Sequence, residues 1–363
     1  MPGSSIGQRL VLTSFGESHG ICVGAVLDGC PAGLELDEND IQKMLNLRKP
    51  GQSLVSTQRK EEDKVEILSG IFRGYTTGAP IAMIIWNADH DSRAYEQLRT
   101  KMRPGHSDYP ALIKYKKFND FRGGGRFSGR LTATHVMGGA IARKLLKTTL
   151  GIETNSYTLQ IGKIRMSKVT QQMMKMIYSN EVRCPDKKTA KKMRDIILAA
   201  RKKGDSLGGV IESVTTNLPV GLGEPIFGSL ESDLGKALYS IPAVKGVEFG
   251  SGFAGAETFG SQNNDPYMIK NGKIVTKTNN SGGILGGLSN GMPIVLRIAF
   301  KPASSILKKQ TTVDIKTKKP TSLQVTGRHD PCVVPRAPPV VDSLVSLVIA
   351  DHALQSGFIK PVL

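Results

Sequence analysis

The segment SGRLTATHVMGGAIARKLLKTTLG, residues 128–151, predicts a long helix. Apolar side chains between Ala133 and Leu145 recur at spacings of three and four, which is the period of one helix face. Ser128 can open the helix, which we expect to end at about Thr149, and Gly151 can stop it. The other predicted elements lie before and after this helix.

Shorter periodic segments flank the helix on both sides. Six runs predict strands: residues 9–15, 21–28, 65–71, 81–86, 208–217 and 293–300. Four further segments predict helices: residues 37–47 with Asp37 as N-cap, 167–179, 187–203, and a last helix that follows Pro338 and Pro339 and runs to about Gln355. Strand and helix do not alternate regularly and no repeat is visible. We therefore predict a mixed α+β fold, with one domain over residues 1–363.

Composition narrows the class of protein. The 363 residues contain no run of eighteen apolar residues, so we expect no transmembrane helix, and residues 1–8 carry no secretory signal. The four cysteines form no CxxC pair and no metal-ligand spacing, which predicts reduced thiols in a cytoplasmic protein. They stand at Cys22, Cys30, Cys184 and Cys332.

The charge of the chain favours anionic partners. Lysine and arginine number 49 against 31 acidic residues, a net charge of +18 that suits either nucleic acid or small polyanionic metabolites. The basic run 183–203 is typical of a solvated helix face. A second set of arginines lies outside this run, most of them beside glycine, proline or histidine, and their planar guanidinium groups suit phosphate and carboxylate. These are Arg48, Arg59, Arg103, Arg122, Arg126, Arg130, Arg328 and Arg336.

Three polar loops each contain a histidine: SFGESHG at 14–20, RPGHSD at 103–108, and RHDPCVVPRAPP at 328–339. Such clusters cost stability and are more often sites than scaffold, so we predict that the three loops share one pocket. Imidazoles near their ordinary pKa can move protons at neutral pH. His135 and His352 fall on predicted helices and are interpreted as structural, and His90 as part of a surface turn. The histidine spacings match no zinc motif, so no metal is predicted.

Glycine-rich segments offer further ligand contacts. GGGRFS at 123–128 precedes the long helix and could bind an anion at its N-terminus, or be a plain loop with a serine cap. NSGGILGG at 280–287 is by itself more typical of a bulge or turn. Lys301 to Ser305 ends a strand with one cation and two hydroxyls, which suits phosphate.

Taken together and in order, the motifs resemble those of the chorismate synthase family over nearly the whole chain. They are FGESHG, RPGQS, QRKEEDKVEILSG, RPGHSDY, RGGGRFSGR, IPAVKGVE, GSQNND, SGGILGGLSNG, KPASS and GRHDPCVVPRAP. The resemblance implies a β-α-β sandwich of antiparallel sheets around helices. It also implies a lyase that converts 5-enolpyruvylshikimate 3-phosphate to chorismate and phosphate, the last step of the shikimate pathway. The reaction is a 1,4-anti elimination that needs reduced FMN, and the family's enzymes are homotetramers.

The resemblance also implies residue roles. His19 would protonate the leaving phosphate, and His106 would protonate or stabilise the reduced flavin near its N1–C2 oxygen edge. Asp330, with Ser18 and Ser128 as a relay, would help flavin N5 take the C6 proton. Implied substrate contacts are Arg48, Arg59, Arg103, Arg130 and Arg328. Implied FMN contacts are Arg126, Phe127, Ser128, Pro242, Ala243, Gly286, Lys301, Pro302, Ala303, Ser304, Ser305 and Arg328.

The chain departs from the family pattern in the segment that some members associate with NADPH, which includes Arg48. Leu47 and Lys49 stand where arginines are common, and so does Leu54. Phe127 replaces a small residue, and Ser107 a common alanine. We therefore expect NADPH to serve only if flavin reduction is intrinsic. The rival hypotheses are a basic nucleic-acid-binding protein and another flavin-dependent redox enzyme. A nucleic-acid-binding protein is expected to carry aromatic residues among its basic ones, yet aromatic residues make up only 6% of the chain, so nucleic acid is not expected as a partner. A membrane is not expected as a partner either.

Overall fold

Two five-stranded antiparallel sheets frame the molecule. The computed structural model describes residues 3–51, 53, 55–56, 61–88, 93–167, 169–325 and 329–363. The first sheet has the order β1-β2-β3-β7-β4, and the second has the order β11-β16-β10-β8-β9. The strands of the first are β1 (Ser5–Ile6), β2 (Val11–Gly16), β3 (Cys22–Asp28), β7 (Ile81–Trp86) and β4 (Glu66–Ile67). Those of the second are β11 (Val244–Phe249), β16 (Ile294–Phe300), β10 (Gly209–Thr216), β8 (Glu153–Ile161) and β9 (Ile164–Arg165).

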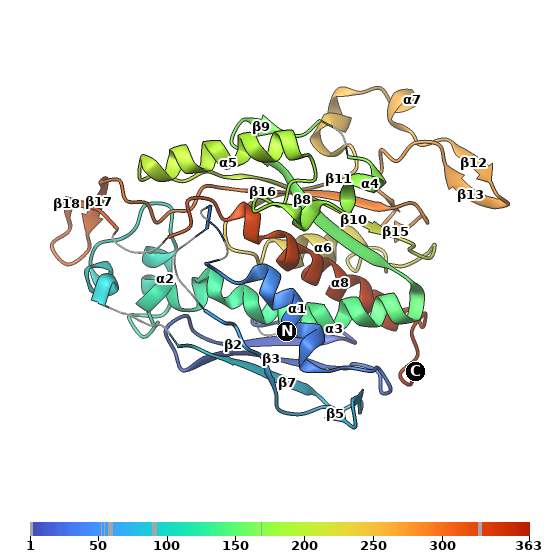
Figure 1. Ribbon diagram of the computed structural model, residues 1–363, viewed down its shortest axis with the longest axis horizontal. Helices are drawn as coiled ribbons and strands as arrows, with labels where there is room; N and C mark the ends of the chain where they lie inside the picture. Colours follow the sequence, from blue (N-terminus) through green and yellow to red (C-terminus); the bar gives the residue numbers. More distant parts are fainter. Residues whose placement is uncertain are drawn as a thin grey trace.

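Helices fill the space between the sheets (Figure 1). This middle layer contains α1 (Glu38–Arg48), α3 (Thr132–Leu150), α6 (Leu230–Leu238) and α8 (Pro338–Gln355). The basic helix α5 (Lys187–Lys202) lies on the outer face of the second sheet. The predicted α+β sandwich of antiparallel sheets around helices is therefore confirmed.

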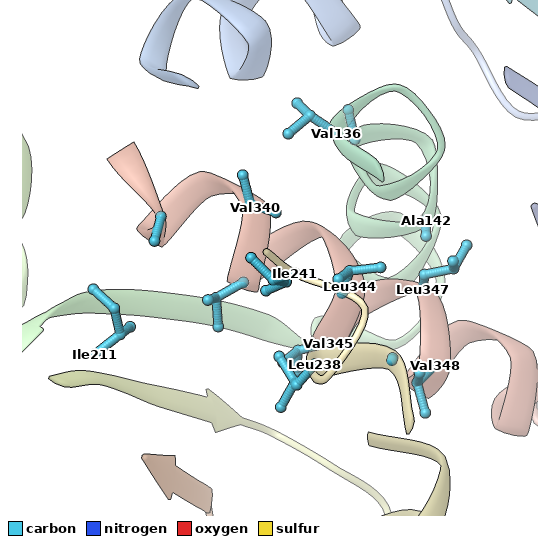
Figure 2. Packing of buried hydrophobic residues seen from close by; sticks show 14 of the residues in the cluster. Val136, Ala142, Ile211, Leu238, Ile241, Val340, Leu344, Val345, Leu347 and Val348 are labelled. Carbon is cyan, nitrogen blue, oxygen red and sulfur yellow. The ribbon is translucent and has the colours of Figure 1, made fainter. Parts of the chain in front are cut away.

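Close contact between α3 and α8 forms the centre of the core. α8 is buried from Pro338 to Ala353, as expected of a helix with apolar residues on all sides. A side chain at Gly139 would collide with the backbone of Ser343, so glycine is needed there for the two helices to touch. Figure 2 shows Ala142 of α3 beside Leu347 of α8 and Val136 of α3 on the side of Val340, with Leu238 of α6 and Ile211 of β10 in the same cluster.

The last helix, α8, is also hydrogen-bonded to the segment that precedes β2. Asp351, near the end of α8, accepts hydrogen bonds from the backbone N–H groups of Gln8, Arg9 and Leu10, at distances from 2.7 to 3.0 Å. These donors come just before β2, and the carboxylate is 4% exposed. The two ends of the chain are thus joined through one buried side chain.

Smaller elements decorate the frame. They are α2 (Asp108–Lys114), α4 (Gln171–Met174), α7 (Gly260–Asn263) and the two-stranded pairs β5 (Ile71–Phe72) with β6 (Tyr75–Thr76), β12 (Tyr267–Lys270) with β13 (Lys273–Thr276), β14 (Ile284–Leu285) with β15 (Leu288–Ser289), and β17 (Gln310–Asp314) with β18 (Lys319–Leu323). The β12–β13 hairpin projects from the body at one end (Figure 1).

Several predicted bounds needed correction. The long helix begins at Thr132, because Ser128 instead caps a short 3-10 turn over Gly129–Leu131. The helix expected at 167–179 is reduced to α4 and a 3-10 turn at Ile177–Ser179. The run 65–71 forms two short strands, β4 and β5. β8, β11 and α6 were not predicted.

Candidate active site

A cavity of about 740 Å³ opens between the two sheets, at the loops that precede α3 and α8. Each of the three histidine-containing loops contributes to its wall, through Ser18, His106 and Asp330 respectively. Segments that are far apart in sequence therefore meet at one place, as the loop chemistry predicted. Other wall residues are Arg48, Glu61, Tyr95, Arg103, Gly123, Arg126, Phe127, Ser128, Arg130, Pro242, Ala243, Lys245, Lys301, Ala303, Ser304, Ser305, His329 and Arg336.

His106 is presented by a tight turn. The N–H of His106 donates to the carbonyl of Arg103 at 3.2 Å, and Gly105 between them has φ of 72°, a left-handed conformation that favours glycine. The carbonyl of Gly105 accepts from Lys301 Nζ at 2.9 Å and from Ser304 Oγ at 2.6 Å. The KPASS loop therefore fixes the turn that carries His106.

Asp108, two residues after the histidine, is the common partner of this loop. Its carboxylate accepts from Arg103 Nε at 2.8 Å and Nη2 at 2.7 Å, and His106 Nδ1 lies 2.6 Å from Oδ1. Burial alone would raise the pKa of Asp108, but hydrogen bonds and positive charge from Arg103 and His106 hold it well below its usual range. Arg103 completes its contacts by donating to Ser305 Oγ at 3.1 Å.

A second buried cluster joins Arg48 and Arg130 through Asp63. Arg48 Nη1 donates to Asp63 Oδ2 at 2.9 Å, and Arg130 pairs with Asp63 and also with Glu61. Arg48 further donates to Thr132 Oγ1 and to the carbonyls of residues 129 and 130. Burial lowers the pKa of Arg48 to about 10, with Asp63 opposing, so the guanidinium stays charged at neutral pH. Burial would raise the pKa of Asp63, yet the two arginines lower it.

His19 lies behind the cavity wall. It is 4% exposed, and its ring meets that of Tyr95 edge-on, with 5.1 Å between the ring centroids. A Cβ at Gly123 would overlap the His19 ring and crowd Ser18 Oγ, so the glycine loop lies directly against both residues. Ser18 Oγ is buried and has no hydrogen-bond partner within the described ranges. The wall thus contains a hydroxyl suited to a ligand.

Asp330 lies at the C-terminal side of the cavity, where Arg336 Nη1 donates to it at 2.6 Å. Arg336 Nε also donates to the carbonyl of Arg48 at 3.2 Å, which links this loop to the end of α1. The predicted substrate contacts Arg59 and Arg328 fall outside the described residues.

The predicted flavin contacts are divided between the wall and its surroundings. Arg126 turns toward the first sheet, where it donates to the carbonyls of Ser14 and Gly16. Ser128 Oγ accepts from the N–H of Arg130 at 3.3 Å. Pro302 and Gly286 do not line the cavity; Gly286 lies in the β14–β15 turn, beyond the start of α6. Arg126 and Ser128 belong to the wall, and so do Phe127, Pro242, Ala243, Lys301, Ala303, Ser304 and Ser305.

Comparison with known proteins gives the family. A family model described as chorismate synthase matches residues 10–354. A chorismate synthase of Korarchaeum cryptofilum is 53% identical over 357 residues, covering 98% of this chain and 99% of the relative. One from Dehalococcoides mccartyi is 52% identical over 361 residues and covers 99% of both chains. The chain belongs to the chorismate synthase family. Its class of enzyme is accordingly a lyase.

A solved structure described as chorismate synthase also matches, with a TM-score of 0.75, 30% identity and coverage of 96% of this chain and 93% of the other. The fold expected of a chorismate synthase is therefore present. Within the described ranges, no group of three or more histidine, cysteine or acidic residues is placed to hold a metal. The helices that the structure describes include none long and apolar enough to cross a membrane.

Sequence reasoning missed the acidic half of the site. Glu61 and Asp63 lie in the QRKEEDK motif, and Asp108 lies in RPGHSDY, yet only the basic residues and the histidines of these motifs were given roles. The presence of carboxylates beside predicted anion-binding arginines was the available signal. Tyr95 and Lys245 also line the cavity and were given no role; Tyr95 lies in the 3-10 turn Arg93–Arg99, and Lys245 lies in β11.

Proposed function

We propose that this cavity carries out the reduced-FMN-dependent 1,4-anti elimination of phosphate from 5-enolpyruvylshikimate 3-phosphate, giving chorismate. The observation that carries the proposal is the meeting of Ser18, His106 and Asp330 in one wall, with lysine and arginine around them. A substrate with two carboxylates and a phosphate needs such a cationic enclosure. Family membership supports the same assignment.

The residues present fit a flavin mononucleotide. The cavity volume suits a cofactor together with a small substrate. Among the residues that the structure describes, Ser18 Oγ has no hydrogen-bond partner. The pKa of Lys301 is lowered by burial and by nearby Lys245, as expected of two cations that face one anion site. Residues 126–128, 242–243, 301 and 303–305 would hold the cofactor. Reduced FMN would supply transient electron density to the substrate.

The proton-moving groups are assigned from the family motifs. His19 would donate a proton to the leaving phosphate oxygen, with Tyr95 fixing its ring. His106 would hold a proton at the N1–C2 oxygen edge of the cofactor. Asp330, with the hydroxyls of Ser18 and Ser128 as a relay, would help the flavin N5 take the proton that leaves C6 of the substrate. These steps use general acid–base chemistry at neutral pH.

The arginines would act on the substrate chiefly through charge and shape. Arg48 already makes four hydrogen bonds inside the protein, so its proposed contribution to substrate binding is positive potential and a rigid wall. The same engagement weighs against a direct NADPH contact by Arg48. We accordingly propose that flavin is reduced outside this protein and then bound by it. We also propose that the chain folds as one domain and assembles as a homotetramer.

Anaerobic turnover with chemically reduced FMN tests the proposal. Chorismate and inorganic phosphate should appear in equal amounts, with no net oxidation of the flavin. Flavin oxidation without phosphate release would instead support a redox enzyme acting on another anion. Tight binding of nucleic acid with no turnover would favour the remaining alternative.

A further inference from the structure

We propose that Asp108 is the positioning residue of His106: its carboxylate keeps the proton on Nδ1 and leaves Nε2 free to act in the cavity. The inference rests on the proposed function only where it gives His106 a catalytic role. The hydrogen bonding of the imidazole itself can be tested without turnover.

The distances around Nδ1 decide where the proton lies. Nδ1 is 2.6 Å from Asp108 Oδ1 and 3.0 Å from Arg103 Nη2. A lone pair on Nδ1 facing a carboxylate oxygen at 2.6 Å would be strongly repelled, whereas an N–H there makes a short charge-assisted hydrogen bond. Arg103 Nη2 already has an acceptor in the same oxygen, at 2.7 Å. Nδ1 therefore donates to Asp108, and the arginine shares that acceptor.

Asp108 is itself fixed, as a positioning residue must be. Besides the Nη2 contact, Oδ2 accepts from the backbone N–H and from Nε of Arg103, at 3.0 and 2.8 Å. Arg103 is 4% exposed at its side chain and is held on its other side by Ser305. Asp108 is the first residue of α2, and its carboxylate stays ionised because its pKa is held far below neutrality. The position of the Asp108 carboxylate thus depends on the buried guanidinium of Arg103.

The opposite nitrogen faces the glycine loop. A Cβ at Gly124 would lie 3.5 Å from both Nε2 and Cε1 of His106, so this edge of the ring faces the glycine loop, and His106 itself lines the cavity. With the proton fixed on Nδ1, Nε2 carries the lone pair and can accept a proton. The imidazolium that forms would be stabilised by Asp108. A buried carboxylate that selects a tautomer in this way changes rates by large factors when neutralised.

The test compares wild type with Asp108→Asn. An asparagine amide turned toward His106 would donate to Nδ1 and move the ring proton to Nε2. Nitrogen-15 NMR of the imidazoles, assigned with His106→Gln, reads the tautomer in full-length protein with and without FMN. We expect a protonated Nδ1 in wild type and an Nε2–H tautomer in the variant. Turnover with reduced FMN should fall by roughly 10²–10⁴-fold, with substrate KM and FMN Kd changed by less than about threefold.

Asp186→Asn is the matched control, because it removes the same charge while asparagine can still cap α5. It should keep wild-type turnover and His106 shifts. An unprotonated Nδ1 in wild type would overturn the proposal even if the variant failed to fold. So would weakened FMN or substrate binding in Asp108→Asn with kcat retained, since that would mean Asp108 only anchors the loop. Inactivity of wild type itself would instead count against the proposed function.

Discussion

Carboxylates hold the basic side chains of this site before any ligand enters. Asp63 lies between Arg48 and Arg130, and Asp108 lies between Arg103 and His106. A guanidinium fixed in this way loses little conformational freedom when an anion binds, so less binding free energy is spent on ordering it. The carboxylates also offset part of the positive charge, which reduces the electrostatic repulsion between the cationic side chains of the cavity.

The two predicted acid–base histidines provide the first test. His19→Ala and His106→Ala should each lower turnover with reduced FMN by roughly 10²–10⁴-fold, the usual loss when a positioned acid or base is removed. FMN binding, followed by the flavin absorbance spectrum, should largely persist. His352→Gln, which changes a buried histidine of α8 that contacts Asp233, controls for loss of an imidazole outside the cavity. Near-normal turnover in either alanine variant would refute that residue's assignment.

Asp63 should matter chiefly for stability. Asp63→Asn leaves two buried guanidiniums without their shared counter-charge, which should lower the free energy of unfolding by about 3–5 kcal/mol. Denaturant unfolding followed by tryptophan fluorescence measures it. Glu96→Gln, which breaks an ion pair with Arg99 whose side chains are more than 60% exposed, should cost at most about 1 kcal/mol. Equal losses in the two variants would show that the buried cluster has no special role.

At the scale of elements, the glycine loop at 123–125 determines how closely the surrounding segments approach. All three glycines have positive φ, and the loop lies against His19, Ser18 and His106. A larger residue there would displace catalytic groups rather than the core. The loop therefore transmits backbone geometry directly to the proposed chemistry.

Gly123→Ala should accordingly impair activity more than stability. The new Cβ would overlap the His19 ring, so we expect turnover to fall at least tenfold while cooperative unfolding persists. Gly235→Ala is the control: it lies within α6 with open space around it, and alanine should stabilise that helix by up to about 1 kcal/mol. Wild-type activity in Gly123→Ala would mean that His19 can move without consequence.

The α3–α8 contact contains a buried carboxyl that should make stability depend on pH. Burial raises the pKa of Asp342 from 3.8 to about 6, although Arg143 donates to it at 3.1 Å. A group whose folded-state pKa is raised contributes stability below pH 4 and loses it as the pH rises through 6. Asp342→Asn should therefore be more stable than wild type above pH 6, by up to roughly 3 kcal/mol, and the gain should shrink toward pH 4. Thermal unfolding from pH 4 to 8 measures this, and parallel profiles would contradict it.

At the scale of the whole molecule, the pattern of small and apolar residues predicted most of the framework. The helix capped by Asp37, the 81–86 strand and the last helix through Gln355 are formed as expected, although that last helix begins at Pro338 itself. β8 was missed because its buried side chains include the polar Thr154, Ser156 and Thr158 beside Leu159 and Ile161, so its sequence shows no clear alternation of polar and apolar residues. The pairing of Asp63 with Arg130 joins residues from separate motifs, and no local pattern reveals such a contact.

Whether the complete enzyme can reduce its own flavin with NADPH can be tested directly. Leu47, Lys49 and Leu54 remove cationic positions from the segment tied to NADPH, and Arg48 is engaged internally. We expect little or no chorismate from NADPH with oxidised FMN in air, but full activity once a flavin reductase is added. Efficient turnover without the reductase would overturn this expectation and leave the elimination chemistry intact. Sedimentation of the same sample would test the expected tetramer.

The carboxylate of Asp351 also has a consequence for synthesis on the ribosome. Gln8, Arg9 and Leu10 emerge early, but their acceptor is added about 340 residues later. At roughly 5–20 residues per second, the nascent N-terminal strands would wait about 17–70 s for α8. During that interval they would carry open edges and uncovered apolar faces, so the newborn chain should need chaperone protection until translation is complete. A chain halted before Pro338 should remain aggregation-prone however long it is given to fold.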